Sequence, residues 1–521
     1  VTFNWAGSTS KQLEVHCKEV TVPDYFISTP IYYVNDVPHL GHAYTMINAD
    51  SFSRWHRGMG DDVYFLTGTD EHGQKVAESA EKANMSVEDW CDSYSGRFRN
   101  AWSKLEVTYD DFIRTTENRH RVSVQKFLQA VYDNGYIYLA KYEGHYCVSC
   151  EAYYSDAEME SGMCPVHKRP LSVMAEENYF FRLSAFQEDI LKWYESGNDV
   201  VFPDFRKNEA LSFVRGGLQD ISISRTSISW GIPLPWDERH VCYVWFDALI
   251  NYLTGIGYGE GGPKFEARWA NSHHLIGKDI IRFHCVWWPA MCMAAGLKPP
   301  TQALVHGWLL VQGEKMAKSG GNGVDPINLV ETYGVEAVRY YLMREHALGS
   351  DGDFSLEALE QRYNVELANN IGNLLSRVTN IVERSLDSIS PSSTGRVIDS
   401  SIVQGHVDRA RDFWNGYASS RALEEVQNLV RYTNSVLEDR APWKVSDLNE
   451  LGEILGDALE VLRLVALLTS PVLVRSSRTI LSAIGIDPTI IDFDFSGQLS
   501  WGEYQGGAKV LKAKPLFPRI S

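Results

Sequence analysis

The stretch that decides the fold is DYFISTPIYYVNDVPHLGH, at residues 24–42. Its first six residues have the pattern of a buried strand, a proline-rich turn follows them, and a helical pattern begins near Leu40. A second apolar strand, VYFLTGTD at 63–70, comes after that helix, and a helix rich in Ala, Glu and Lys follows from Gly73. Strand–helix–strand alternation predicts a Rossmann-like, doubly wound parallel sheet of the α/β class.

The alternation stops near residue 135 and resumes near residue 231. Residues 135–230 are dense in Tyr, Cys, Gly and charged side chains, which is typical of an inserted module. Beyond them, VCYVWFDA (241–248), HLIGKDI (274–280) and ALVHGWLLV (303–311) are predicted to be further strands. The sequence therefore predicts one domain in two halves, 23–134 and 231–300, after a lead at 1–22.

From about residue 355 the pattern is helical. Apolar side chains recur at helical spacing through 420–437 and again at Leu455, Leu459, Leu462 and Ala466. This periodicity predicts an α-helical bundle over 359–521, joined to the α/β domain by a connecting region at 301–358.

Composition limits the function. A chain of 521 residues predicts two to four domains. The net charge of −18 argues against indiscriminate binding to polyanions, although one local basic surface is compatible with it. We expect no membrane span and no secretory signal, because the chain has neither a long apolar run nor a charged head before one. Scattered cysteines favour a reducing compartment.

Two histidines lie at the head of the first predicted helix. A helix N-terminus offers unpaired N–H groups and the positive end of a dipole, which suits a phosphate near His39 and His42. Gly41 between them has no side chain to block an approaching adenine. Taken alone, this motif fits a pair of structural histidines at a helix cap equally well.

Two lysines lie in the glycine-rich stretch KMAKSGGNGVDP at 315–326. On a flexible loop, Lys315 and Lys318 can reach over a triphosphate and stabilise charge that develops at phosphorus. Such a loop closes for chemistry and opens for release. Taken alone, a solvated basic turn also explains this motif.

Four potential metal ligands lie in the predicted insertion. Cys147-x2-Cys150 is followed, after thirteen residues, by Cys164-x2-His167. This spacing predicts a tetrahedral zinc ion with three thiolates and one imidazole. Because protein would fill all four positions, the ion would be structural. Free thiols are the alternative.

Together the motifs resemble a known family. HLGH and the KMAKS that follows about 275 residues later resemble the paired signatures of class I aminoacyl-tRNA synthetases. STPIYYVNDVPHLGH, LTGTDEHGQK, YVWFDALINY, HLIGKDIIRFH and HGWLL resemble the methionyl-tRNA synthetases of the bacterial or organellar type, from about Tyr25 to the C-terminus. Ala317 departs from the family's usual Ser, which we expect to affect loop dynamics more than activity.

The resemblance implies the site residues. It implies a catalytic role for His39, His42, Lys315 and Lys318. The implied ATP-binding residues are His39, Gly41, His42, Lys278, His306, Gly307, Lys315, Met316 and Lys318. The implied methionine-binding residues are Ile31, Tyr33, Asp70, Trp245, Ala248, Leu249, Tyr252, Ile280, Phe283 and His284.

Within the implied methionine pocket, Asp70 would take the α-ammonium group in a charge-assisted hydrogen bond. Aromatic walls suit a thioether, because sulfur makes favourable contacts with aromatic rings. Without the motif, Trp245 or Phe283 would be assigned to core packing. Leu249 stands where some relatives have Pro.

In the bundle the resemblance implies that Asn373, Arg377 and Trp443 read the tRNA anticodon. Asn and Arg can hydrogen-bond base edges, and an exposed Trp can stack on an unstacked base. Asn373 and Arg377 are four residues apart, so they project from one helix face. Trp443, which follows a proline, would otherwise be a packing residue at a helix start. Region 301–358 would then hold the KMSKS-type loop and contact the tRNA stem.

The implied activity is that of a methionine–tRNA ligase. It would use ATP with Mg²⁺ to convert L-methionine to methionyl-adenylate and pyrophosphate, and then charge tRNA(Met), initiator tRNA included. Many relatives continue into a C-terminal domain that makes them dimers, and this chain ends soon after the bundle, so we expect a monomer. We expect a cytoplasmic location, with an organellar matrix or stroma as the alternative.

Three other functions compete with this one. Another class I synthetase would need a large editing domain for Ile, Val or Leu, or an active-site zinc for Cys. A catalytically inactive tRNA-binding scaffold or zinc-ribbon protein does not need the intact motif residues. A nucleotidyltransferase that adenylates another acid would not depend on Trp443.

Overall fold

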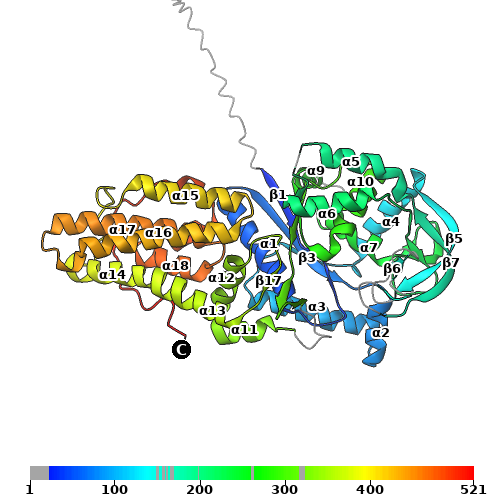
Figure 1. Cartoon of the computed structure of the whole chain (residues 1–521), viewed down its shortest axis with the longest axis horizontal. Coiled ribbons are helices and arrows are strands. Elements are labelled where there is room, and N and C mark those ends of the chain that lie inside the picture. The colour runs from blue at the N-terminus through cyan, green and yellow to red at the C-terminus, as the bar shows by residue number, and fades with distance from the viewer. Residues whose placement is uncertain are drawn as a thin grey trace, which may run out of the picture.

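The computed structural model describes residues 23–147, 152–154, 159, 162–164, 169–197, 199–259, 263–315 and 323–520. Its centre is a parallel sheet with the strand order β4–β3–β1–β13–β14–β8, in which short β2 continues along the end of β3 (Figure 1). The strands are β1 Asp24–Ser28, β2 Tyr32–Tyr33, β3 Asp62–Asp70, β4 Asp111–Arg114, β8 Val201–Phe202, β13 Ser272–Gly277 and β14 Gln302–His306. The expected α/β class and the first two strands are confirmed.

The sheet buries both of its faces. Successive side chains of a strand point to opposite sides, so Tyr25 and Ile27 pack in one core with α1 (Leu40–Gly58), while Phe26 packs in another with α4 (Asn118–Asp133) and α10 (Trp288–Ala294). The chain leaves β1 through α1 to reach β3, whereas β13 leads to β14 on the other side. The boundary between β1 and β13 is therefore the topological switch point, where open α/β sheets bind ligands.

The prediction of a strand at 241–248 is wrong. Strand β12 (Asp237–Cys242) ends early, and helices α7 (Val244–Leu249) and α8 (Asn251–Thr254) follow it. An apolar run of this length fits a buried helix as well as a buried strand, and Val244, Phe246 and Leu249 are buried on α7. Strand β12 pairs antiparallel with β10 (Ser224–Arg225) and β11 (Pro233–Leu234), apart from the parallel sheet.

The other two predicted strands are shorter than expected. After β13 the chain turns into the 3-10 helix η2 (Lys278–Ile280) and the π-helix η3 (Phe283–Trp287). Residues 303–311 divide between β14 and β15 (Leu309–Val311), which belongs to a small sheet with β16 (Glu314–Lys315) and β17 (Gly352–Asp353).

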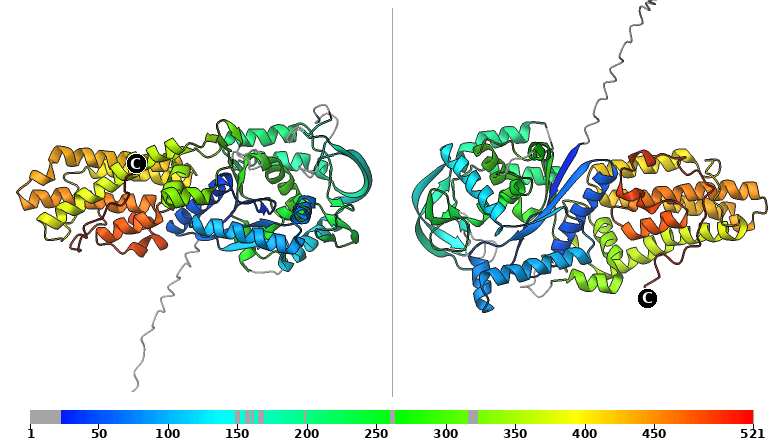
Figure 2. Two further views of the ribbon diagram at one scale, coloured as in Figure 1. Left: turned by 90° about the horizontal axis from the view of Figure 1, so that it is seen from below. Right: turned by 180° about the vertical axis from the view of Figure 1, so that it is seen from behind.

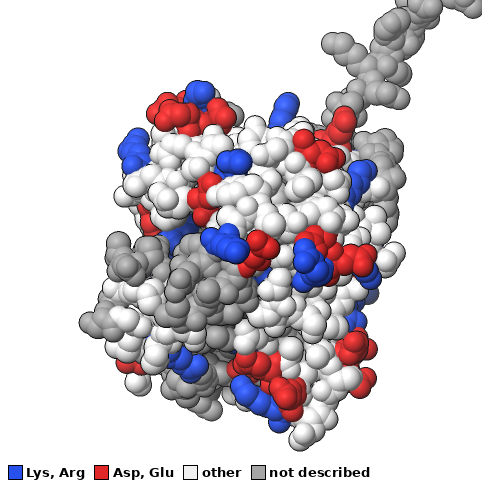
Figure 3. All heavy atoms as spheres, turned by 90° about the vertical axis from the view of Figure 1, so that its right-hand side faces the viewer, with Lys and Arg blue, Asp and Glu red and all other residues white. Residues whose placement is uncertain are grey.

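The described residues of the stretch predicted as an insertion contribute strands to three sheets, one of which is the sheet of β10 with β11 and β12. β5 (Ile137–Cys147) and β7 (Ser172–Phe181) form a long antiparallel ribbon with β6 (Ala152–Tyr154) and β9 (Ile221–Ser222), at the end of the molecule away from the bundle (Figure 2). Between β7 and β9, helices α5 (Gln187–Glu195) and α6 (Asp204–Arg215) flank β8, which joins the parallel sheet. Basic and acidic side chains are intermixed over this end of the molecule (Figure 3).

The predicted bundle is helical up to α18. Its elements are α13 Leu356–Arg362, the π-helix η5 Tyr363–Gly372, α14 Asn373–Ser385, α15 Ser400–Asn415, α16 Ser419–Arg440, α17 Leu448–Thr469 and α18 Val474–Ala483. After α18 the chain runs back along the bundle, where Ile389 bridges to Lys509. The bundle and the sheet share one apolar core, in which the rings of Trp55 and Trp414 stack with centroids 5.7 Å apart. Among the helices in the described ranges, none has the length and apolarity to cross a membrane.

Candidate active site

The head of α1 holds the first motif. His39 is the N-cap residue, and its Nδ1 accepts the backbone N–H of Gly41 at 3.1 Å, while Nδ1 of His42 accepts the backbone N–H of His39 at 3.3 Å. This reciprocal cap places the proton of each neutral imidazole on Nε2, and the two rings stack with centroids 3.7 Å apart. A Cβ on residue 41 would lie 2.8 Å from the His39 ring, so glycine keeps the helix head open to a phosphate.

The segment after the second motif contacts the same helix head. Lys315 ends β16, whereas Met316 and Lys318 lie outside the described residues. The chain re-enters the structure beyond the glycines, where the carbonyl of Val324 accepts the N–H of Leu40 at 3.0 Å. The residues that follow the lysine motif are thus bonded to the first turn of α1, although the two segments are far apart in the sequence.

The end of β14 faces α1. Nε2 of His306 lies 2.8 Å from Oγ1 of Thr45, and Nδ1 lies 2.7 Å from the carbonyl of Gly307, which makes Nδ1–H the donor and Nε2 the acceptor. Burial lowers the pKa of His306, so the ring is neutral at pH 7. A Cβ on Gly307 would lie only 2.1 Å from the carbonyl oxygen of Ser350, so the backbone packs directly on the 349–353 segment.

Lys278 lies at the end of β13, held by a carboxylate. Its Nζ is 2.5 Å from Oδ2 of Asp351 and 4.0 Å from the ring centroid of Trp308. Oδ1 of Asp351 accepts the N–H of Trp308 at 2.9 Å. Asp351 was not predicted as a site residue, because it belongs to the connecting region and reaches Lys278 only through the pairing of β17 with β15.

A second group of predicted residues lies at the end of β3. Asp70 is buried, and its neighbour across the sheet is Tyr33. The hydroxyl of Tyr252 donates to Nε2 of His284 at 2.7 Å, because Nδ1–H of that ring donates to the carbonyl of Ile280 at 3.1 Å. Burial raises the pKa of Tyr252, and the charge of nearby Asp70 adds to this effect; burial lowers the pKa of His284 to about 4. Both side chains are neutral at pH 7, and Tyr252 lies close enough to the Asp70 carboxylate to feel its charge.

Aromatic and apolar side chains complete this group. The rings of Trp245 and Phe283 stack with centroids 3.7 Å apart and an interplanar angle of 4°. Ala248 and Leu249 follow on α7 and are buried. Five predicted pocket residues are only partly buried and pack on the same core cluster: Ile31, Tyr33, Trp245, Ile280 and Phe283. The structure thus brings the predicted aromatic wall together, while Leu249 is a residue of the core.

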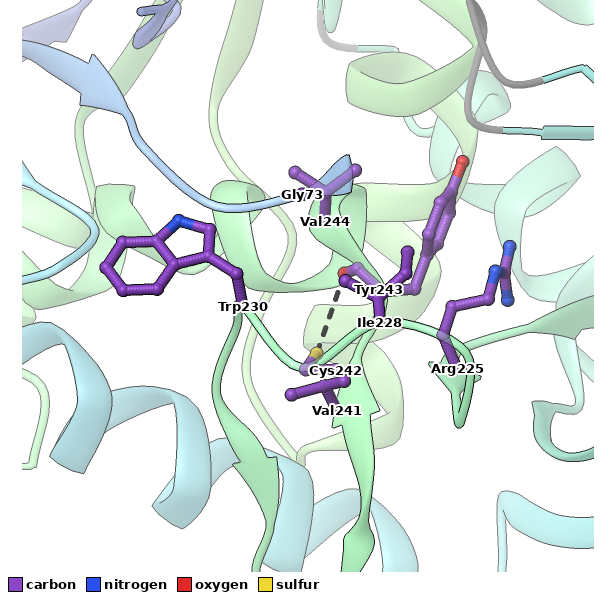
Figure 4. A pocket seen from close by; sticks show the side chains of 8 residues that line it. All are labelled: Gly73, Arg225, Ile228, Trp230, Val241, Cys242, Tyr243 and Val244. Carbon is purple, nitrogen blue, oxygen red and sulfur yellow. Dashed lines mark hydrogen bonds between the residues drawn. The ribbon is translucent and has the colours of Figure 1, made fainter. Parts of the chain in front are cut away.

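A small pocket is lined by Val244, the first residue of α7, and by Gly73 of the loop after β3, which lie next to each other (Figure 4). The N–H of Gly73 is 3.5 Å from the carbonyl of Trp230, whose indole N–H donates to the carbonyl of Glu71 at 2.6 Å. The loop after β3 therefore packs against α7 and the segment before β11.

The structure describes two of the four predicted zinc ligands. Cys147 at the end of β5 and Cys164 are both buried, and Cys150 and His167 lie outside the described residues. Cys147 pairs with Ala152, and the N–H of Cys164 donates to the carbonyl of Arg169 at 2.8 Å. Among the residues with a described position, no group of three or more metal-ligating side chains is found.

The three predicted anticodon residues are close to one another at the surface of the bundle. Asn373 begins α14 and is exposed, and Arg377 follows one turn later. The Arg377 guanidinium lies 5.1 Å from the ring centroid of Trp443, which is 51% exposed. Core packing therefore does not explain Trp443, and the indole face is accessible to a ligand.

The fold and these contacts define a class I aminoacyl-tRNA synthetase: a doubly wound sheet, a histidine motif at the head of α1 that is bonded to the segment after the lysine motif, and a helical bundle with an exposed aromatic residue. The family model described as "tRNA synthetases class I (M)" matches residues 25–171 and 167–379. The chain belongs to the methionine–tRNA ligase family within that class.

Relatives match over almost the whole chain. A methionine–tRNA ligase of Streptomyces coelicolor is 42% identical over 519 residues, covering 95% of this chain and 96% of its own. One from Rickettsia typhi is 41% identical and covers 95% and 99%. A solved structure of Mycobacterium tuberculosis methionyl-tRNA synthetase in complex with methionyl-adenylate has a TM-score of 0.90 and 37% identity, covering 96% of this chain and all of that one. These matches do not favour another class I synthetase or an inactive scaffold.

Proposed function

We propose that the chain activates L-methionine with ATP and transfers it to tRNA(Met), initiator tRNA included. One observation carries this proposal: the head of α1, the residues after the lysine motif and the Asp70–Tyr252–His284 group all lie at the carboxyl edge of one parallel sheet. The relative solved with methionyl-adenylate supports the choice of substrates.

Methionine would bind between Asp70 and the aromatic wall. The Asp70 carboxylate is the partner for the α-ammonium group, and Trp245 and Phe283 offer polarisable faces to the thioether. The rings of Trp245 and Phe283 cover each other, so the methionine side chain would enter beside or between them. Because one methylene changes binding by only ~1–3 kcal/mol, homocysteine is expected to compete.

The methionine carboxylate would then attack the α-phosphorus of ATP in line, and the bond to pyrophosphate would break. His39 and His42 would donate hydrogen bonds to the phosphates at the helix head, joined by Lys278, and the backbone at His306 and Gly307 would lie along the adenine. Lys315 and Lys318 would stabilise the negative charge on the departing pyrophosphate. Mg²⁺ bound with ATP would offset part of the phosphate charge.

In the second step a hydroxyl of the 3′-terminal ribose of tRNA would attack the carbonyl carbon of the adenylate, and AMP would leave. The contact between Arg377 and Trp443 supports the anticodon role of this part of the bundle, since a guanidinium beside an exposed indole presents both a base-edge donor and a stacking face.

The chain would act as a monomer in the cytoplasm, and light scattering that gives the mass of one chain is the expected result.

One structural zinc ion would be held by Cys147, Cys150, Cys164 and His167. Cys147 and Cys164 are both buried, which suits a thiolate site. We expect about one zinc per chain by elemental analysis in the wild type, much less in Cys147→Ser, and no change in the buried control Cys292→Ser. Equal zinc in all three proteins would refute this site.

The direct test of the activity is ATP–pyrophosphate exchange with each of the twenty amino acids. We expect exchange with methionine, its loss in Lys318→Ala, and wild-type exchange in Lys82→Ala, a control on α2 (Gln74–Lys82) whose side chain is 78% exposed. If the wild type exchanged with no amino acid, the enzyme proposal would fail and a tRNA-binding scaffold would replace it.

A further inference from the structure

A buried carboxylate bonds two histidines next to the proposed methionine site. Asp247 on α7 has no solvent exposure; its Oδ2 lies 2.6 Å from Nδ1 of His72, and its Oδ1 lies 2.7 Å from Nε2 of His120. His120 is on α4, and its Nδ1 lies 3.1 Å from Oγ1 of Thr254 on α8. Burial alone would raise the pKa of Asp247, but the charges and hydrogen bonds of the two histidines lower it to about 2. The carboxylate is therefore ionised at any working pH.

This network joins the two halves of the proposed pocket. His72 follows Asp70 by two residues in the loop after β3, and Asp247 stands between Trp245 and Ala248 on α7. The bond from Asp247 to His72 is thus a direct link between the loop that carries the ammonium-binding carboxylate and the helix that carries the aromatic wall. Figure 4 shows Gly73 of that loop next to Val244, the first residue of α7.

The residue between Asp70 and His72 is fixed from the other side. Glu71 is fully buried; its carboxylate accepts hydrogen bonds from Thr69, Arg114 and Thr116, and its N–H donates to Oγ1 of Thr115 at 2.9 Å. With Glu71 held by β4 and His72 held by Asp247, the backbone at Asp70 has little freedom to shift. A site that binds a small zwitterion needs this rigidity, because misplacing one contact by about 1 Å costs much of its effect.

We propose that Asp247, acting through His72, is a positioning residue that sets the distance between Asp70 and the Trp245 wall and thereby determines the affinity for methionine. The inference rests on the proposed function, and it names a residue that touches no substrate. Its prediction is specific: loss of the link raises KM for methionine and leaves KM for ATP unchanged, since the ATP motifs are carried by α1, β13 and β14.

The histidine offers the sharpest test. In His72→Asn the amide nitrogen occupies the position of Nδ1 and can still donate to Asp247, whereas His72→Leu has a similar bulk and no donor. In ATP–pyrophosphate exchange we expect KM for methionine to rise about tenfold in Asp247→Asn and in His72→Leu, as for a lost charge-assisted hydrogen bond, and to return near the wild-type value in His72→Asn.

A matched control separates positioning from stability. Asp457 on α17 is also fully buried, and it accepts the backbone N–H groups of Thr394, Gly395, Val397 and Ile398 far from the site. Asp457→Asn should lower the unfolding temperature without changing KM for methionine. The inference would be overturned if the KM for methionine and the KM for ATP rose equally in Asp247→Asn and His72→Leu, or if His72→Asn did not restore the KM for methionine. Neither result would touch the proposed activity. Absence of exchange in the wild type would instead refute the activity itself. If Asp247→Asn does not fold, the His72 pair decides alone.

Discussion

Replacing Gly307 by alanine should disable the enzyme through a backbone collision. A Cβ at this position would lie 2.1 Å from the carbonyl oxygen of Ser350, whereas ordinary contacts begin at 3.4 Å, so the two segments must separate by about 1.3 Å. Neither can move freely, because the N–H of Trp308 donates to Asp351 at 2.9 Å and the N–H of Gly352 donates to the carbonyl of Trp308 at 3.0 Å.

The expected cost follows from these contacts. Overpacking costs ~1–3 kcal/mol, and a broken hydrogen bond adds ~0.5–1.5 kcal/mol, so Gly307→Ala should lower the free energy of unfolding by ~2–4 kcal/mol. His306 adjoins the collision, and a displacement of about 1 Å at such a residue reduces the rate by ~10²-fold. Methionine-dependent ATP–pyrophosphate exchange measures the rate, and thermal unfolding measures the stability.

The bundle supplies a control with the same collision. A Cβ on Gly456 of α17 would lie 2.1 Å from the carbonyl oxygen of Ser392. Gly456→Ala should therefore lose comparable stability but keep its exchange rate at a temperature where both variants are folded. Full exchange activity in Gly307→Ala, or an equal loss of exchange in Gly456→Ala, would refute the reasoning.

Two further predictions concern the bundle and the sheet. Trp443→Ala should reduce tRNA charging by ~10- to 100-fold, because base stacking on an aromatic side chain contributes ~1–3 kcal/mol. ATP–pyrophosphate exchange should stay at the wild-type rate. A parallel loss of charging and exchange would contradict the anticodon role. Burial, with the charge of His56 adding, lowers the pKa of His273 from 6.5 to about 4. As the pH drops, the unfolded chain therefore binds a proton at this histidine before the folded chain does, and the free energy of unfolding falls by up to ~3 kcal/mol between pH 6.5 and 4. In His273→Phe the free energy of unfolding should depend less steeply on pH over this range. An unchanged slope would contradict this role of His273.

Hydrophobic periodicity and helix start signals correctly predicted the helices and strands whose conformation depends mainly on neighbouring residues in the sequence. The strand at 24–29, the helix from Leu40 and the bundle helices through Leu455 and Leu462 follow directly from periodicity and helix start signals. The error at 241–248 has a physical reason: a continuous apolar run reports burial but not backbone conformation. Nothing in that run distinguishes a buried strand from α7 until its partners in space are known.

The motif residues could be identified because each lies in a short segment with its own chemistry. Their positioning partners could not, because the structure pairs residues that are remote in the sequence: His72 with Asp247, 175 residues apart, and Lys278 with Asp351, 73 residues apart. Nothing in the sequence around Asp247, on an apolar helix, or around Asp351, after Gly349 and Ser350, indicates that it would bond His72 or Lys278. These contacts depend on which strands and helices are neighbours.

The sheet register predicts that this site tolerates little change. Ser28 of β1 is level with Leu66 of β3 and His274 of β13, and Gly277 at the end of β13 is level with His306 at the end of β14. The segments that leave these strands therefore start from one edge, and a slip of one residue in any strand would move its functional segment and turn its side chains to the other face. Because the edge is shared, the close backbone contact of Gly307 with Ser350 supports the geometry of the proposed ATP-binding residues beside it. Substitutions that wedge neighbouring strands apart should consequently reduce adenylate formation more than equally destabilising substitutions in the bundle.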